Sequence, residues 1–308
     1  MTFRFSASQA IAGLLLCLCV FVSQTHAFQL QVNDRLVDLP LLAIPVTPGE
    51  WLTVEVVGSR PSPVSMWLND EPVTHQGNVW RWRVPGQGPD LYRLSVSDGI
   101  DERVVKLLVK RPRSEVRNGQ LNGYRIGAYP EQPLNGLDIY LPPRGFVEVT
   151  EANRNLRISP HYRLGDFVAK QPGDYPKYLV VRPELLMKLE TVQAALVEAG
   201  VPITRFQILS GYRTPFYNRA IGNGQYSRHV WGGAADIFID ESGDGQMDDL
   251  NGDGQICIED ARWLAAFVDE LSRGGKLGDN VGGIGIYGPR PWRGPFVHVD
   301  VRGFHARW

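Results

Sequence analysis

Short apolar runs that alternate with polar residues fill the chain from Phe28 to about Arg111. Runs such as LQVN, WLTVEVV and VWRWRV have the period of half-buried strands, and the clusters TPGE, LNDEP, PGQGPD and SDGID are rich in turn-forming residues. The turns recur at intervals of about 8 to 12 residues, a spacing typical of an antiparallel sandwich. We therefore predict an all-β, immunoglobulin-like domain over residues 28–112.

The pattern changes after the basic stretch RPRSEVRNGQ, which begins at Arg111. Residues 183–200 have helical apolar spacing, with Pro183 near the start and Gly200 at the end, and a second helix is predicted over about 260–271. Apolar strand-like runs surround both helices without a regular βαβ order, which indicates an α+β domain. We assign residues 113–157 to a linker with its first strands and residues 158–308 to this second domain.

Composition limits the classes of protein to consider. The chain has 308 residues, of which 43% are hydrophobic and 21% charged, with a formal net charge of −1. These values describe a globular protein and exclude a disordered or collagen-like chain. A nearly neutral chain is also a poor partner for nucleic acid, so we expect none.

The first 27 residues have the order of a secretory signal peptide. Arg4 gives the n-region its positive charge, residues 10–22 form the apolar h-region, and Ala27 is a small residue at the predicted cleavage site. Because no later run is long and apolar enough, we expect no stable membrane span after cleavage and a periplasmic or secreted protein. Cleavage would leave Cys257 as the lone cysteine, so no intrachain disulfide is expected.

Three residues have the chemistry of a metal site. His229 and Asp236 are seven positions apart and are separated by small residues that allow close backbone approach, and His298 lies in the apolar run FVHVD. Two imidazoles and one carboxylate suit zinc, and three protein ligands leave a fourth position open, as in catalytic sites.

Four ordered motifs carry a resemblance to a known family. They are SGYR ending at Arg213, the S-x-H segment with His229 followed by alanine and Asp236, the G-x-G-x-Y segment ending at Tyr287, and FVH ending at His298. Over residues 158–308 the chain resembles the zinc D-Ala-D-Ala carboxypeptidases, a family that includes L-alanyl-D-glutamate endopeptidases and shares the hedgehog fold. The resemblance implies a hedgehog/D,D-peptidase-like domain, zinc held by His229, Asp236 and His298, and Arg213 as the group that stabilises the oxyanion.

The chain departs from this family at one position. Many members carry an acidic general base three positions before the last histidine, where this sequence has Pro295. Asp300 lies two residues beyond His298, on the same face of a strand, and is either the base or a carboxylate that orients His298. The end of the chain is similar to murein endopeptidases in which FVHxD is followed by arginine and tryptophan.

An acidic loop lies between the second and third zinc ligands, at residues 240–260. Its second half has the spacing of a calcium loop and resembles dockerin-type loops. The predicted calcium ligands are Asp249, Asn251, Asp253, Gln255 and Asp260. Asp240, Ser242 and Asp244 begin a second, overlapping loop whose closing position falls on Asn251, which is already used, so the sequence predicts either one or two calcium ions.

Together these features predict an exported zinc metallopeptidase that hydrolyses peptide bonds in peptidoglycan stem peptides or crosslinks. The expected cofactors are zinc and calcium, and the expected partner is peptidoglycan. The residues do not specify which bond is cut. Because Pro295 replaces the usual base, the alternative is a non-catalytic zinc- and calcium-binding cell-wall protein.

Overall fold

The structure is a computed structural model that describes residues 28–58, 64–74, 77–88 and 90–308. The predicted signal peptide lies outside these residues. The described chain combines many strands with three α-helices, α1 (Pro183–Glu198), α2 (Pro215–Ala220) and α3 (Ile258–Arg273), which confirms the predicted mixture of α and β structure. Within this part of the chain, none of the helices has the length and apolar character needed to cross a bilayer.

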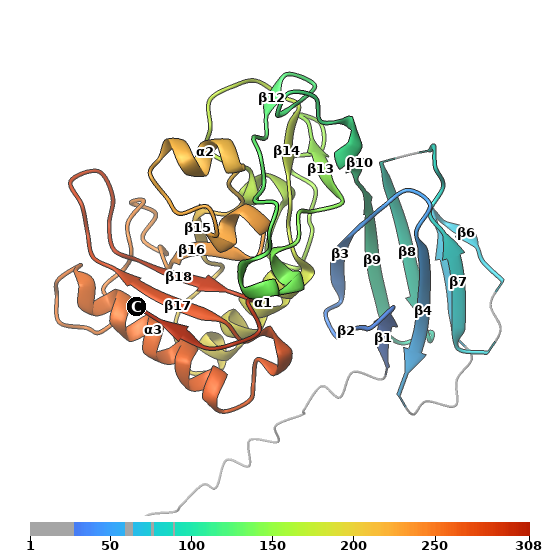
Figure 1. Ribbon diagram of the computed structural model, residues 1–308. Helices are drawn as coiled ribbons and strands as arrows, with labels where there is room; N and C mark the ends of the chain where they lie inside the picture. The colour runs from blue at the N-terminus through green and yellow to red at the C-terminus, as the bar shows by residue number, and fades with distance from the viewer. Residues whose placement is uncertain (1–27, 59–63, 75–76, 89) are drawn as a thin grey trace, which may run out of the picture.

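Two β-sheets that face each other form the N-terminal part of the structure (Figure 1). The first has the order β2-β1-β4-β7, with β1 (Gln29–Val32), β2 (Arg35–Val37), β4 (Trp51–Val57) and β7 (Val79–Arg83). The second has the order β3-β9-β8-β5-β6, with β3 (Leu41–Val46), β5 (Ser65–Leu68), β6 (Glu71–Pro72), β8 (Leu91–Ser97) and β9 (Glu102–Val109). The predicted all-β character of this region is confirmed, whereas its immunoglobulin-like topology stays a prediction.

Strand β3 is absent from the sequence prediction. Its residues LLAIPV do not alternate and include Pro45, which cannot donate a ladder hydrogen bond. The strand lies at the edge of its sheet, where this missing donor is tolerated, and it pairs with β9 in parallel. The sandwich is therefore not purely antiparallel.

The predicted linker contributes strands of its own. The sheet β10-β13-β14 contains β10 (Arg111–Pro112), β13 (Gly145–Val149) and β14 (Lys177–Leu179), and β11 (Gln120–Leu121) pairs with β12 (Tyr124–Arg125). Aromatic residues of this segment, such as Tyr129 and Tyr140, share a buried cluster with Trp231. The 113–157 segment thus packs against the region that holds the metal-ligand candidates.

A five-stranded sheet organises the C-terminal part, with the order β15-β16-β18-β17-β19. Its strands are β15 (Gln207–Ser210), β16 (Ala234–Phe238), β17 (Gly283–Tyr287), β18 (Phe296–Asp300) and β19 (Ala306–Arg307), and α3 packs against β17 and β18. Short 3-10 helices connect the elements at Arg113–Glu115, Leu134–Gly136, Asp138–Tyr140, Leu164–Phe167, Arg228–Trp231 and Gly278–Asn280. Both predicted long helices are present, as α1 and α3.

The N-terminal sheets contact the C-terminal part directly. The Ala43 amide of β3 donates to the Ile158 carbonyl at 2.7 Å, and Arg35 forms an ion pair with Glu184 of α1 at 2.6 Å. Buried residues of both parts belong to one continuous apolar cluster. The structure does not test the predicted domain boundaries, which stay predictions.

Helix α1 buries a lysine beneath the C-terminal sheet. Lys188 is 1% exposed, and its ammonium donates to the Asp300 backbone carbonyl at 2.8 Å. Burial lowers the pKa of Lys188 to about 8, from an ordinary value of 10.5. At neutral pH the folded protein therefore holds a charge that burial disfavours.

Replacing Lys188 with methionine is expected to raise the free energy of unfolding at pH 7 by about 1–3 kcal/mol. Between pH 8 and 10.5 the unfolded chain binds a proton that the folded protein has released, so Lys188 makes wild-type stability rise with pH there. The variant should lose this rise. Urea unfolding at pH 7 and pH 9.5 measures both effects, and equal pH dependence of the two proteins would contradict them.

Candidate metal centre

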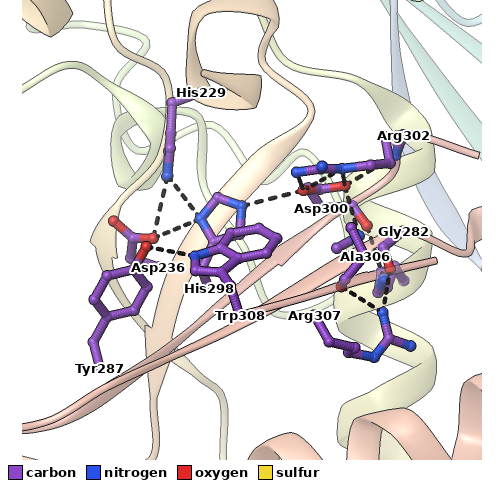
Figure 2. Close-up of polar contacts among 12 residues, drawn as sticks. His229, Asp236, Gly282, Tyr287, His298, Asp300, Arg302, Ala306, Arg307 and Trp308 are labelled. Atoms are coloured by element: carbon purple, nitrogen blue, oxygen red, sulfur yellow. Dashed lines mark hydrogen bonds and ion pairs between the residues drawn. The ribbon is translucent and has the colours of Figure 1, made fainter. Parts of the chain in front are cut away.

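Three side chains converge from separate segments (Figure 2). Strands β16 and β18 pair so that Asp236 lies opposite His298, while His229 comes from the preceding 3-10 turn. Asp236 Oδ1 is 3.2 Å from His229 Nε2 and 2.9 Å from His298 Nδ1, and these two nitrogens are 3.1 Å apart. All three residues are buried. The structure thus brings together the three predicted zinc ligands.

The environment of each ligand suits a metal ion. His229 Nδ1 is 2.6 Å from the Gly211 carbonyl oxygen, to which it can donate, leaving Nε2 with a free lone pair. Burial alone would raise the pKa of Asp236, but His229 and His298 outweigh it and hold the pKa well below its usual range. Ligand atoms around tetrahedral zinc lie about 3.3 Å apart, because each bond is about 2.0–2.1 Å. The residues therefore fit zinc.

A glycine turn makes this convergence possible. Gly232 ends the 3-10 turn with a φ of 64°, a left-handed conformation that side chains disfavour. A Cβ atom there would also overlap the Val180 backbone carbonyl. Gly232 thus serves close packing of the turn against the Val180 backbone, whereas the close approach of the backbone to a metal, which the spacing predicted, stays a prediction.

Asp300 lies on the side of the His298 ring opposite Asp236 (Figure 2), and it is not among the residues that line the cavity. Its carboxylate is completely buried, is 3.2 Å from His298 Nε2 and accepts hydrogen bonds from Arg302 and the Gly283 amide. Burial alone would raise its pKa, but the hydrogen bonds from His298 and Arg302 hold the pKa well below its usual range. Such a carboxylate is a weak base, so this geometry favours the orienting role of Asp300 over the general-base role.

Replacing Asp300 with asparagine is expected to weaken zinc binding by about 10- to 100-fold. The amide can donate to His298 Nε2, which would place the imidazole proton on Nδ1, the nitrogen that faces the metal site. Competition with a zinc chelator measures the affinity, with circular dichroism as the check on folding. An unchanged affinity in a folded variant would exclude the orienting role.

Arg213 contacts a metal-ligand candidate directly. Its Nη2 is 2.5 Å from Asp236 Oδ2, and its Nε donates to Ser210 Oγ at 2.8 Å. Asp236 therefore presents one oxygen to the histidines and the other to Arg213. The guanidinium also lines the cavity beside the three ligands, a position suited to a developing oxyanion, although that role stays a prediction.

A cavity of about 600 Å³ opens over the three ligands. Four arginines line it, whereas Asp236 is the one carboxylate among the described lining residues. The position of the usual base is taken by Pro295, which is buried and has no carboxylate side chain. The arginines are Arg213, Arg228, Arg293 and Arg302. Of these, only Arg213 was predicted from the sequence, although the arginine after FVHxD was a signal for Arg302.

Trp308 forms a wall of the cavity close to His298. Its indole ring lies 5.2 Å from the His298 ring, and Nε1 donates to the Tyr287 hydroxyl at 2.8 Å. The ring covers Gly285, where a Cβ atom would overlap it, whereas a Cβ atom at Gly283 would first overlap the Asp300 carboxylate and then Arg302 and the indole. These contacts are the physical reason for glycine at both positions of the G-x-G-x-Y motif.

The acidic loops close on their own backbone. Asp249 accepts amide hydrogens from Gly252, Asp253 and Gly254, and Asp240 does the same in the first loop for Gly243, Asp244 and Gly245. Asp260 is buried and accepts from the Leu250, Asn251 and Cys257 amides, while Gln255 and Ser242 are exposed. Within the described residues, three or more ligand atoms of histidine, cysteine, aspartate or glutamate converge only at His229, Asp236 and His298. Calcium binding stays a prediction.

The fold and site define a mixed α/β protein with a convergent His₂Asp metal site. A model of the Peptidase M15 family matches residues 166–250, a segment that contains Arg213, His229 and Asp236 but ends before His298. M15 peptidases are zinc-dependent. The chain is therefore similar to this family of peptidases over that segment, and the convergent ligands agree with the similarity.

No curated protein matches the chain in sequence. Among solved structures, an IG27 protein domain is 15% identical with a TM-score of 0.19, covering 27% of this chain and 94% of that one. Fibronectin(III)-like modules of Clostridium thermocellum CbhA are 17% identical with a TM-score of 0.18, covering 26% and 94%. A polysaccharide lyase is 14% identical with a TM-score of 0.24, covering 81% and 32%. These TM-scores are too low to support an argument about fold or function.

Proposed function

We propose that the protein is an exported zinc metallopeptidase that hydrolyses peptide bonds in peptidoglycan stem peptides or crosslinks. The observation that carries this proposal is the convergence of His229, Asp236 and His298 beside Arg213 in an open cavity. The Peptidase M15 match over two of these ligands supports it. The proposed location is the periplasm or the exterior, because the substrate lies there and the sequence begins like a signal peptide.

The chain's own residues have distinct tasks in this function. A bound zinc ion would polarise the scissile carbonyl and make water more acidic. The Gly211 carbonyl and Asp300 hold the imidazoles so that His229 Nε2 and His298 Nδ1 face the site. Arg213 holds the free oxygen of Asp236 and offers positive charge where the carbonyl oxygen gains electrons. Tyr287, Phe296 and Trp308 contribute aromatic rings to the wall of the cavity.

Mass spectrometry of muropeptides tests the proposal. Purified peptidoglycan is incubated with the zinc-loaded mature protein, beside a His229→Ala variant. We expect new stem-peptide fragments that are absent from the variant, and their masses identify the bond. Intact muropeptides from several wall types, with zinc confirmed bound, would refute the peptidase function.

A non-catalytic zinc- and calcium-binding wall protein is the second candidate. The observation that favours it is that Pro295 stands at the position of the usual base and that the described cavity lining provides no carboxylate other than Asp236. This candidate requires binding without cleavage. Co-sedimentation of the protein with intact peptidoglycan, together with unchanged muropeptides, would support it.

We also propose that the acidic insert binds calcium and braces the rim of the cavity. The backbone of Gly294, in the loop between β17 and β18, approaches Gln246 and Met247 of the insert closely, and Gly288 approaches Ile258. Oxygen ligands at the spacing of Asp249, Asn251 and Asp253 suit a hard cation. Ordering this insert would therefore order the loop at the cavity rim.

Calcium is expected to raise the melting temperature by several degrees at saturation, because it binds the folded state alone. Asp249→Asn should remove most of this shift. Asp279→Asn, which removes a carboxylate outside the insert, should leave the shift unchanged. Differential scanning calorimetry with calcium and with chelator measures the effect. A melting temperature that is insensitive to both would contradict calcium binding.

A further inference from the structure

Arg293 lies in the loop between β17 and β18 and is held in a defined orientation. Its Nη1 donates to the Gly288 and Gly294 carbonyls at 2.8 and 3.1 Å. Its guanidinium lies 4.5 Å from the centroid of the Phe296 ring, which itself stacks on Tyr287 at 4.6 Å. The loop carbonyls and an aromatic stack thus fix the guanidinium beside the metal-ligand candidates.

The other edge of this guanidinium is free. No described residue accepts a hydrogen bond from Arg293 Nε or Nη2, and none offers it a carboxylate within ion-pair distance. The side chain is half-buried and lines the cavity that contains His229, Asp236 and His298. Nε and Nη2 form one side of the planar fork, which matches the two oxygens of a carboxylate.

The three other arginines of the cavity are occupied or enclosed. Arg213 pairs with Asp236, and Arg302 pairs with Asp300. Arg228 is 2% exposed, and its Nε and Nη2 are buried without a partner, so a ligand cannot reach them. Among the described lining arginines, Arg293 is therefore the one that has no carboxylate partner and still combines a fixed position with an accessible edge.

The charge of the cavity points to the same chemistry. Four arginines face one lining carboxylate, and a zinc ion would add two further positive charges. A cavity with this excess attracts anions and disfavours cationic peptides.

We propose that Arg293 binds a carboxylate of the peptide substrate and so selects peptides with a free carboxylate near the scissile bond. This inference rests on the peptidase function proposed above. The carboxylate comes from the C-terminal residue of the substrate or from an acidic residue within it. Arg293 acts as a specificity-determining residue, because it positions the substrate and takes no part in bond cleavage.

The test uses the zinc-loaded mature protein and three peptides: a stem pentapeptide, its C-terminal amide, and the version with D-isoglutamine in place of D-glutamate. Wild type should cleave one of the two amidated peptides with a kcat/KM about 10- to 100-fold lower than that for the pentapeptide. The amidated position in that peptide identifies the carboxylate that Arg293 binds. Arg293→Gln should lower kcat/KM for the pentapeptide by the same factor, mainly through KM. The same variant should cleave that amide as wild type does.

Two further variants serve as controls. Arg290→Gln removes an exposed arginine of the same loop that does not line the cavity, and it should behave as wild type. Arg293→Lys keeps the charge without the fork and should restore part of the selectivity. An equal loss on all peptides would assign Arg293 a structural role in the loop, and unchanged selectivity in Arg293→Gln would also overturn the proposal.

A binding measurement separates this inference from the peptidase function. If wild type cleaves none of the peptides, titration calorimetry with the same three peptides still reports carboxylate selectivity. Selective binding that Arg293→Gln abolishes would support the inference while the peptidase function fails. Equal binding of acid and amide forms, or no binding, would overturn it.

Discussion

Replacing His298 with alanine is expected to remove bound zinc and to lower kcat/KM for peptidoglycan peptides by at least about 1000-fold. The imidazole supplies one of three converging ligand atoms, and its Nδ1 is 2.9 Å from Asp236 Oδ1. A metal that polarises a carbonyl contributes several kcal/mol to the transition state, and each 1.4 kcal/mol corresponds to about tenfold in rate. Zinc content by elemental analysis and initial rates of peptide release measure the two effects.

His305→Ala is the matched control for this prediction. His305 is exposed, lies outside the cavity lining, and contacts Ser272 and Arg307. This variant should retain zinc and activity. If His298→Ala kept a full equivalent of zinc and wild-type turnover, the assignment of the metal site would be wrong.

Replacing Arg213 with alanine is expected to lower kcat by about 10²- to 10³-fold while zinc remains bound. The guanidinium lies beside the ligands, where negative charge would develop on the carbonyl oxygen, so its loss raises the energy of the transition state more than that of the bound substrate. KM should change little. Steady-state kinetics on the peptide identified by mass spectrometry, with zinc content measured in parallel, provides the test.

The contact between Arg213 and Asp236 defines the competing explanation. Arg213 Nη2 is 2.5 Å from Asp236 Oδ2, so the arginine could instead act by orienting a ligand. In that case Arg213→Ala would lose zinc in proportion to activity, and added zinc would restore turnover. Loss of turnover at full zinc occupancy would support the direct electrostatic role.

Much of the fold was predictable because it depends on local patterns. The alternating runs became β1, β4, β5, β7, β8 and β9, and the apolar spacing with Pro183 near the start became α1. Strand β3 was not predictable in this way. Its residues do not alternate and include Pro45, and they form a strand because the neighbouring strand β9 provides the hydrogen bonds.

The residues of the candidate site also differ in whether local patterns could predict them. His229, Asp236, His298 and Arg213 were predictable because their types and order within motifs carry the chemistry. Arg293 was not, because an arginine in a loop has no local signature of facing a cavity. The two possible roles of Asp300 separated only when its contacts with His298, Arg302 and the Gly283 amide were defined.

The sequence by itself determined most of the elements, the ligand types and the glycines that allow close approach, since these depend on neighbouring residues and side-chain chemistry. The tertiary structure decided which groups meet. The pairing of β16 with β18 places Asp236 opposite His298, and the turn at Gly232 directs His229 toward both. Distances between residues 62 and 69 positions apart, as in this site, arise from sheet register and packing, which no local pattern specifies.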